Sequence, residues 1–387
     1  MAWGAKQDSD DIVYPSSIAF LLIHVACLAA FWTGLTWRAL ALAVLLYLVR
    51  IFAIGAGYHR YFAHRAFRTT RALQVCLAFL AQTSAQRGVL WWAAKHRQHH
   101  RCSDTADDVH SPVQRGFLYA HVGWIFVPRN DATDLAAVRD LAGFPELVWL
   151  DRHPYLPAAL LAAGAWWIAG WPGLAVGFCW STVAVWHATF SINSLAHVVG
   201  RQRYVTGDAS RNNWLLALLT MGEGWHNNHH AYQASVRQGF RWWEYDPTYY
   251  ALRVLSWLGL VWDLHVPPKA VIRGEHRLGR LVIDKVACQL AASFPINQIA
   301  EQVHEALVHT PGWAEVKARL SSARSQAEMF WNDVDLPAVP TLEEVRRYAR
   351  ERLAQTPSLE EIAIRARERL LELVYSQLSK PTVLAPK

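Results

Sequence analysis

The sequence predicts an all-α integral membrane protein in which four transmembrane helices, arranged as two hairpins, carry a helical cap in the cytosol. Three observations lead to this fold class. Hydrophobic residues make up 53% of the 387 residues and charged residues only 18%, whereas about a quarter is usual in soluble domains. Two pairs of apolar runs are each joined by a short turn. Arginines gather in the stretch between the two pairs, which is typical of a cytoplasmic loop.

Each pair of apolar runs predicts a helical hairpin that returns the chain to the side where it began. A run of about 20 residues crosses the hydrocarbon core, and Thr33-Gly-Leu-Thr36 and Gly170-Trp-Pro-Gly173 suit the two turns. The leg that begins at Leu156 is short for a span. We therefore expect a multi-pass protein with both termini and the cap in the cytoplasm. The predicted spans are residues 12–32, 37–57, 156–170 and 174–192.

The cytosolic cap is predicted from residues 59–154 and 197–280, which complete a membrane domain over residues 1–280. Apolar stretches within the cap are too short to span and predict helices at the bilayer surface or inside the cap. The remaining residues, 281–387, form a charged tail with helical spacing of its apolar side chains. Thr341-Leu-Glu-Glu344 in this tail fits a helix-starting capping box.

Charge and cysteine usage exclude several classes of protein. The formal net charge is +7, which the cytoplasmic loops of a membrane protein explain. Nucleic-acid binding is not expected, because the basic residues have no motif or aromatic support. The five cysteines are scattered and contain no C-x-x-C pair, so they predict neither a zinc ribbon, an iron–sulfur cluster nor a disulfide framework. The polar N-terminus lacks the basic start of a cleaved signal peptide.

Histidines carry the functional signal. His59-Arg-Tyr-Phe-Ala-His64 ends the second predicted span, and His96-Arg-Gln-His-His100 follows in the cap. His226-Asn-Asn-His-His230 comes after the second hairpin. Positions i, i+3 and i+4 share one face of a helix, so each H-x-x-H-H motif directs three imidazoles the same way. Positions i and i+5 diverge, so His59 and His64 can converge only where the helix loosens or ends.

Eight imidazoles on one side of a membrane predict a metal site, since packing them together is costly unless something binds them. Imidazole nitrogen suits Fe, Zn, Cu or Ni. Eight ligands are too many for one ion, so the count requires two. A single histidine is usually an ordinary core or surface residue. That reading applies to His24, His110, His121, His153, His187, His265, His276, His304 and His309.

The three histidine motifs, in this order and separated by a membrane hairpin, resemble those of the integral-membrane fatty acyl desaturases, above all the Δ9 group of the stearoyl-CoA desaturase type. Asn193-Ser-Leu-Ala-His197 is similar to a further motif of that group. Gly116-Phe-Leu-Tyr-Ala-His-Val-Gly-Trp124, and Ser210-Arg-Asn-Asn213 followed by Gly222-Glu-Gly-Trp-His226, resemble segments around its second and third motifs. The likeness covers about residues 57–267 and leaves the tail uncovered.

The resemblance implies an enzyme that uses oxygen and two iron ions to introduce a cis double bond, at Δ9, into a saturated acyl chain. It also implies the metal ligands, including a ninth histidine and an asparagine that reaches metal through water. These are His59, His64, His96, His99, His100, His197, His226, His229, His230 and, through water, Asn193.

Two further sets of residues are predicted around such a centre. Metal-bound histidines usually donate their other N–H to a carboxylate or carbonyl, and five acidic residues lie next to the motifs: Asp104, Asp107, Asp108, Asp208 and Glu223. An acyl chain needs a narrow apolar tunnel. We expect Tyr47 to close the tunnel at the methyl end of the chain, and an arginine to bind the phosphates of an acyl carrier. The predicted substrate contacts are Tyr47, Trp91, Trp92, Arg115, Trp186 and Phe190.

Partners follow from what the chain lacks. It has no haem-binding His-Pro-Gly-Gly motif, no cysteine cluster and no Gly-rich nucleotide loop, so we expect a separate electron donor such as a ferredoxin, a rubredoxin or cytochrome b5. The basic cytoplasmic surface favours an acidic donor. The substrate carrier could be coenzyme A, acyl carrier protein or a lipid ester.

Two other functions compete with desaturation. A di-iron membrane hydroxylase of lipids or alkanes would share clustered histidines, but the Asn-Ser-x-x-His and Gly-Glu-Gly-Trp-His contexts favour desaturation. A membrane haem protein with two axial histidines, or a metal transporter, would use single histidines inside spans, such as His24 and His187. Neither explains the adjacent pairs His99-His100 and His229-His230.

Overall fold

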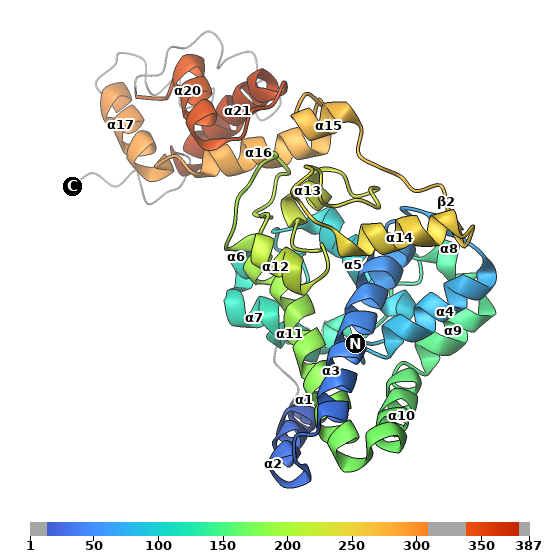
Figure 1. Cartoon of the computed structure of the whole chain (residues 1–387). Helices are drawn as coiled ribbons and strands as arrows, with labels where there is room; N and C mark the ends of the chain where they lie inside the picture. Colours follow the sequence, from blue (N-terminus) through green and yellow to red (C-terminus); the bar gives the residue numbers. More distant parts are fainter. Residues whose placement is uncertain (1–13, 309–337, 379–387) are drawn as a thin grey trace, which may run out of the picture. The chain divides into compact units, whose positions relative to one another are not determined.

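The structure is a computed structural model that describes residues 14–308 and 338–378. It is mostly helical, as predicted, and its described strands are two residues long: β1 (Arg68–Thr69) pairs antiparallel with β2 (Val261–Trp262). The chain forms two compact units (Figure 1). The first comprises the chain through Arg203 together with Ala209–Ile272. The second comprises Tyr204–Asp208 and the chain from Arg273 onward.

The helices of the first unit vary widely in length. Two of them, marked η2 and η5, are π-helices, and the other η elements are 3₁₀ turns. The helices are α1 (Tyr14–Ala26), η1 (Cys27–Ala29), α2 (Ala30–Thr33), α3 (Trp37–Phe52), η2 (Ala53–Ala63), α4 (Arg71–Gln82), α5 (Val89–Cys102), α6 (Pro112–Arg115), α7 (Phe117–His121), η3 (Gly123–Phe126), η4 (Pro128–Asn130), α8 (Arg139–Ala142), α9 (Pro145–Arg152), α10 (Leu156–Pro172), η5 (Gly173–Trp180), α11 (Ser181–Asn193), η6 (Leu195–His197), α12 (Trp214–Leu219), α13 (His226–Ala231), α14 (Pro247–Trp257) and, at the junction with the second unit, α15 (Lys269–Arg273).

The first predicted hairpin corresponds to α1–α2 followed by α3–η2. Gly34 adopts φ 81°, a left-handed conformation that glycine tolerates, and so allows the chain to reverse. The Thr36 hydroxyl then caps α3 by accepting a hydrogen bond from the Ala39 amide. Helices α3 and η2 run together over Trp37–Ala63, 27 residues that are long and apolar enough to cross a membrane. The preceding helix is shorter, and Ile12 and Val13 of the predicted span lie outside the described residues.

The second predicted hairpin lies within a helical stretch over Leu156–His197, which is also long and apolar enough to cross a membrane. This stretch is broken at Ala169 and Gly170, where the backbone leaves the helical region. After the break, Gly173 comes so close to the first leg that a Cβ on it would lie 2.1 Å from the Ala165 carbonyl oxygen. Helix α10 and η5 therefore pack against each other as the two legs of a hairpin (Figure 1). Four membrane crossings remain a prediction.

We expect Gly173→Ala to destabilise the protein by about 1–3 kcal/mol, because the new methyl group has no space beside the Ala165 carbonyl. Gly164→Ala is the matched control on the same helical stretch, since nothing lies within 4 Å of a Cβ at that position. The stability of both variants is measured by thermal denaturation in detergent, with the loss of monodisperse protein as the readout. Equal denaturation temperatures for Gly173→Ala and the wild type would contradict this account of the turn.

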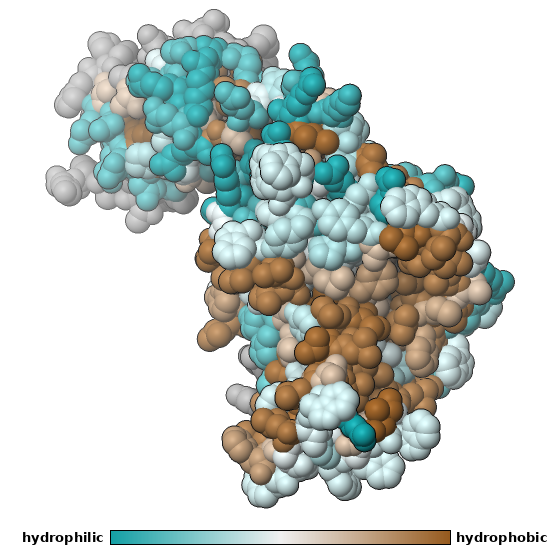
Figure 2. Space-filling view, in the orientation of Figure 1, coloured by the Kyte–Doolittle hydropathy of each residue, from teal (hydrophilic) through white to brown (hydrophobic). Residues whose placement is uncertain are grey.

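The surface of the first unit has the pattern of a protein in a bilayer. Figure 2 shows a broad apolar belt over α3 and the neighbouring helices. Eight of the exposed tryptophans fall into two sets, one beside the hairpin turns and one in the loops and helices that follow the second hairpin. Tryptophan concentrates where a membrane meets water, so the two sets are consistent with the two edges of a membrane. They are Trp32, Trp37, Trp167 and Trp171, and Trp214, Trp242, Trp243 and Trp257.

The core of the first unit fixes the helices that carry histidines. Helix η2 packs against α4 and α5, and α5 packs against α9. Asp151 of α9 accepts hydrogen bonds from the Leu90 and Trp91 amides, at 2.9 and 3.1 Å, and so satisfies the first turn of α5. Apolar residues such as Phe62, Leu77 and Leu90 fill the space between these helices.

The second unit has an apolar core of its own. Its described helices are α16 (Arg280–Ala292), α17 (Ile296–Val308), α20 (Leu342–Arg352) and α21 (Leu359–Leu378), and they bury residues such as Val286, Val345 and Ile362. The predicted capping box at Thr341 is present. Residues 309–337 and 379–387 of the predicted tail lie outside the described residues.

Candidate metal centre

The helix that carries the first histidine motif widens at that motif. Over Ala53–Ala63 the backbone is a π-helix, in which amides bond to carbonyls five residues earlier. The His64 amide accordingly donates to the His59 carbonyl at 3.2 Å. This widening turns two side chains that would diverge on an α-helix toward a common space, and their ring centroids lie 4.9 Å apart. The sequence required a loosened helix here, and the π-helix supplies it.

The other two motifs divide their histidines between two groups. On α5, His96 and His100 face one way and His99 the other. On α13 the division is reversed. His226 and His230 lie in the same group as His99, whereas His229 lies in the same group as His96 and His100. The ligand atoms in each group lie within 4.8 Å of one another. The first histidine group is His59, His64, His96, His100 and His229, and the second is His99, His197, His226 and His230.

The ring nitrogens of the first group form a continuous series. His229 Nε2 lies 2.9 Å from both His59 Nε2 and His100 Nε2. His96 Nε2 lies 3.0 Å from His100 Nε2 and 2.8 Å from His64 Nε2. In the second group, His197 Nε2 lies 3.1 Å from His226 Nε2. All these atoms are Nε2, the same nitrogen of each ring.

This geometry fits bound metal. A neutral imidazole that donates from Nδ1 has only a lone pair on Nε2. Burial and the neighbouring histidines lower the pKa of His64, His96, His100 and His229, so these rings are neutral at neutral pH. Converging lone pairs repel one another unless a cation lies between them. Two groups of imidazole nitrogens are therefore suited to two ions of a metal such as Fe, Zn, Cu or Ni.

Three buried carboxylates accept hydrogen bonds from the Nδ1 atoms of group members. Asp104 accepts from His197 at 2.9 Å and Asp108 from His99 at 3.0 Å. Glu223 accepts from His59. Each bond fixes the ring so that Nε2 faces the group, which is the role such carboxylates have around metals.

The carboxylates are ionised despite their burial. Burial raises the pKa of Asp104, but the hydrogen bonds from His197, Ser111 and the Ala209 amide have the larger, opposite effect and bring the pKa down to about 2. For Glu223 the nearby charge of Arg60 and the bond from His59 outweigh burial and lower the pKa to about 2. The pKa of Asp108 is also lowered, chiefly by His99. These negative charges offset part of the charge of bound cations.

The other two predicted carboxylates occupy different surroundings. Asp107 is exposed, and its carbonyl accepts from the Gln98 side chain at 3.4 Å. Asp208 accepts from the Thr206 hydroxyl and belongs to the second unit. Asn193 lies at the end of α11 and lines both cavities described below.

A network behind Glu223 was not predicted. Arg60 is buried within the first histidine motif and donates to Glu223 at 2.8 Å and to Asp246 at 2.9 Å. Gln238 donates to Glu223 at 3.1 Å. The only sequence signal was an arginine directly after His59.

His110 was predicted to be an ordinary histidine, yet it is buried with its ring centroid 4.4 Å from that of His99.

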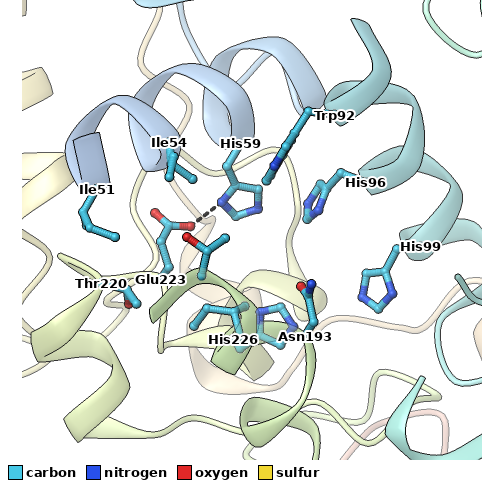
Figure 3. A pocket seen from close by; sticks show the side chains of 12 residues that line it. Ile51, Ile54, His59, Trp92, His96, His99, Asn193, Thr220, Glu223 and His226 are labelled. Atoms are coloured by element: carbon cyan, nitrogen blue, oxygen red, sulfur yellow. Dashed lines mark hydrogen bonds and ion pairs between the residues drawn. The ribbon is translucent and has the colours of Figure 1, made fainter. Parts of the chain in front are cut away.

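Two cavities adjoin the histidines. The smaller one is bordered by Ile51, Thr220 and members of both groups, and Figure 3 shows His59 bonded to Glu223 and facing His96 of α5. The larger has a volume of about 770 Å³, which suits a long ligand. Four predicted substrate contacts line it: Trp91, Trp92, Trp186 and Phe190.

The remaining two predicted substrate contacts do not line either cavity. The Tyr47 hydroxyl donates to the Leu219 carbonyl at 2.6 Å. Arg115 lies over the Tyr119 ring, 4.0 Å from its centroid, and donates to the Tyr119 hydroxyl.

The two histidines of the predicted spans contact each other. His24 Nε2 lies 3.0 Å from His187 Nε2, and His187 Nδ1 lies 2.9 Å from His121 Nε2. At these distances His24 and His187 share a hydrogen bond, whereas two axial haem ligands would face each other from opposite sides of a porphyrin.

Comparison with known proteins identifies the family. The family model for fatty acid desaturase matches residues 35–258. An acyl-CoA 5-desaturase of Anemone leveillei is 36% identical over 296 residues, covering 74% of this chain and 89% of that protein. An sn-2 palmitoyl-lipid 9-desaturase of a Nostoc species is 33% identical over 275 residues, covering 70% of this chain and 96% of that protein.

A third relative, an sn-1 stearoyl-lipid 9-desaturase of a Synechocystis species, is 36% identical over 259 residues, covering 66% of this chain and 81% of that protein. The chain therefore belongs to the fatty acid desaturase family and is a membrane-bound desaturase acting on acyl-CoA or acyl-lipid.

Proposed function

We propose that this desaturase uses oxygen to introduce a cis double bond at Δ9 of a saturated acyl chain, and that its two histidine groups hold two iron ions. The observation that carries the proposal is the convergence of nine imidazoles in two groups beside a long apolar cavity. Relatives named as lipid 9-desaturases support the position of the double bond, and those named as 5-desaturases are the alternative.

The nine grouped histidines are the proposed metal ligands, and Asn193 is proposed to reach metal through water. One group offers five donors and the other four, which leaves room for a water-mediated contact from Asn193, and Asn193 lines the smaller cavity together with His226 (Figure 3). Bound iron supplies the oxygen chemistry that side chains cannot perform, the removal of hydrogen from an unactivated methylene. Asp104, Asp108 and Glu223 orient the ligands through their Nδ1 atoms.

The chain positions the acyl group. Trp92, His96, Thr189 and Asn193 line both cavities, so the larger cavity leads to the smaller one at the histidines. An extended acyl chain in this path brings one C–C bond next to the metal ligands, and the aromatic walls restrict its motion. Trp91 and Trp186 are held rigidly, because their indole N–H groups donate to the Asn130 and Ser84 carbonyls at 2.7 and 2.8 Å.

Tyr47 is proposed to limit acyl chain length. It lies one helical turn before Ile51, which lines the smaller cavity, and its hydroxyl bonds to Leu219 next to the lining residue Thr220. Tyr47→Ala removes this barrier, so we expect the preferred substrate to become longer, because the phenol ring no longer closes the methyl end of the cavity. Product profiles from cells fed saturated acids of graded length measure the shift. Unchanged product lengths would contradict the role.

The proposal includes four membrane crossings, with the metal centre and both termini in the cytoplasm, and a separate electron donor such as a ferredoxin, a rubredoxin or cytochrome b5. Two helices long enough to span and the two sets of exposed tryptophans support the membrane part.

The contact of Arg115 with the phosphates of an acyl carrier stays a prediction. Among the residues lining the larger cavity, Arg87 and Lys95 are the basic ones, and they could serve coenzyme A, acyl carrier protein or a lipid headgroup.

The test is expression in a host that lacks its own desaturase, with a donor system supplied, followed by gas chromatography–mass spectrometry with double-bond location. We expect a new cis-9 monoene. A cis monoene at another position would retain desaturation and refute Δ9. Oxygenated products in place of monoenes would refute the proposal and favour a hydroxylase.

A further inference from the structure

The two histidine groups differ in their access to the surface. All four members of the second group are buried, whereas three members of the first, His64, His96 and His100, are only half-buried. Two of these, His64 and His100, line a hollow of about 400 Å³ that also contacts Arg97, Arg101 and Gln233. The hollow shares no lining residue with either acyl cavity. The first group is therefore approached from two separate sides.

We propose that the hollow lined by His64 and His100 is the docking surface for a small acidic electron-carrier protein, and that electrons enter through the first histidine group. This rests on the proposed function, which requires an external donor. The partly exposed imidazoles are the places where the metal ligands come nearest to a partner in the cytosol. Substrate in the acyl cavities would leave this side free.

The charge around the hollow favours an acidic partner. Arg97 and Arg101 line it, and Arg65 follows His64 directly. Asp140 is shared between Arg65 and Arg97, at 2.9 and 2.8 Å, so the three arginines retain an excess of positive charge. Arg101 is exposed and forms no ion pair within the described part of the chain. Complementary charge steers transient electron-transfer partners, whose interfaces are small.

The arginines of the hollow have different structural roles. Arg97 donates to the carbonyls of Phe62, Ala63 and Ala137, at 2.8, 2.9 and 2.8 Å, and so holds the end of η2. Its replacement would disturb the fold. Arg101 carries charge without such bonds and is the position at which docking can be tested. Arg68 is a matched control, because it is exposed, does not line the hollow, and pairs with Asp263 only at 3.4 Å.

The experiment uses the full chain in lipid nanodiscs and an acidic [2Fe–2S] ferredoxin as the probe. Binding is measured directly, together with desaturation driven either by reduced ferredoxin or by dithionite. We expect salt-sensitive binding by the wild type and about tenfold weaker binding by Arg101→Glu at low salt. Ferredoxin-driven turnover should fall in parallel, while dithionite-driven turnover and binding by Arg68→Glu stay within twofold of the wild type.

Three results would overturn the docking surface. They are absence of salt-sensitive binding by the wild type, equal affinity of Arg101→Glu and the wild type, and an equal loss in Arg68→Glu, which would indicate attraction by overall charge. Failure of the proposed function is distinguishable, because it would appear as absence of monoene with both reductants while the binding measurements still decide the docking surface.

Discussion

His229→Ala is expected to abolish desaturation and to remove metal from the first histidine group. His229 Nε2 lies 2.9 Å from both His59 and His100, so it links the imidazole of η2 to those of α5. Removing this ring leaves a gap in the middle of the group and a vacant coordination position. Loss of the hydrogen-bond partner of a metal ligand costs about 10–100-fold in activity or metal affinity, and loss of a ligand should cost at least about 100-fold.

The cis monoene should therefore fall below detection in the expression host, and the purified variant should contain less metal than the wild type. His153→Ala is the control, because this histidine is exposed, its Nδ1 donates to the Trp149 carbonyl and its ring packs on the Trp149 ring, away from both histidine groups. Wild-type monoene levels in His229→Ala would contradict the assignment of the first group.

Asp104→Asn should reduce activity by about 10–100-fold while the protein remains folded. One Asp104 oxygen accepts from both His197 Nδ1, at 2.9 Å, and the Ala209 amide, at 2.7 Å. An amide oxygen can retain these bonds, but it is neutral and makes His197 a poorer electron donor to metal. The lowered pKa of Asp104 shows how strongly the site favours the ionised form.

Asp107→Asn is the matched control for Asp104→Asn. The two residues lie three positions apart and undergo the same chemical change, but Asp107 is exposed and Asp104 is buried. Initial rates and iron content of the purified proteins give the comparison, and Asp107→Asn should match the wild type. Equal losses in both variants would attribute the effect to the loop, and no loss in Asp104→Asn would remove the carboxylate from the account.

The helical fold, the clustering of the histidines and the family were predictable because they depend on local patterns. Apolar runs fixed the positions of α3, α10 and α11, and the break at Gly170 falls at the predicted turn. The spacing of His59 and His64 required a loosened helix, and η2 is a π-helix at that position. The division of each H-x-x-H-H motif between two groups was not predicted, since a shared helix face was expected to point one way.

What escaped prediction depends on contacts between distant segments. The bonds of Arg60 to Glu223 and Asp246 join η2 to loops more than 160 residues away, at distances of 2.8 and 2.9 Å. The hydrogen bond between Asp104 and His197 likewise joins two distant segments, the turn that follows α5 and the short helix η6. Their closeness to the histidine motifs in the sequence suggested five carboxylates as hydrogen-bond acceptors for the metal-binding histidines. Only the packing of the loops distinguishes the buried Asp104 from the exposed Asp107.

The most direct test of two metal-holding histidine groups is the metal content of the purified chain. Elemental analysis by inductively coupled plasma mass spectrometry, on protein expressed with ample iron and kept free of chelators, should give about two iron atoms per chain. His229→Ala should give clearly less. One iron per chain in the wild type, or a site filled by another metal in active enzyme, would contradict the paired iron centre on which the proposed function depends.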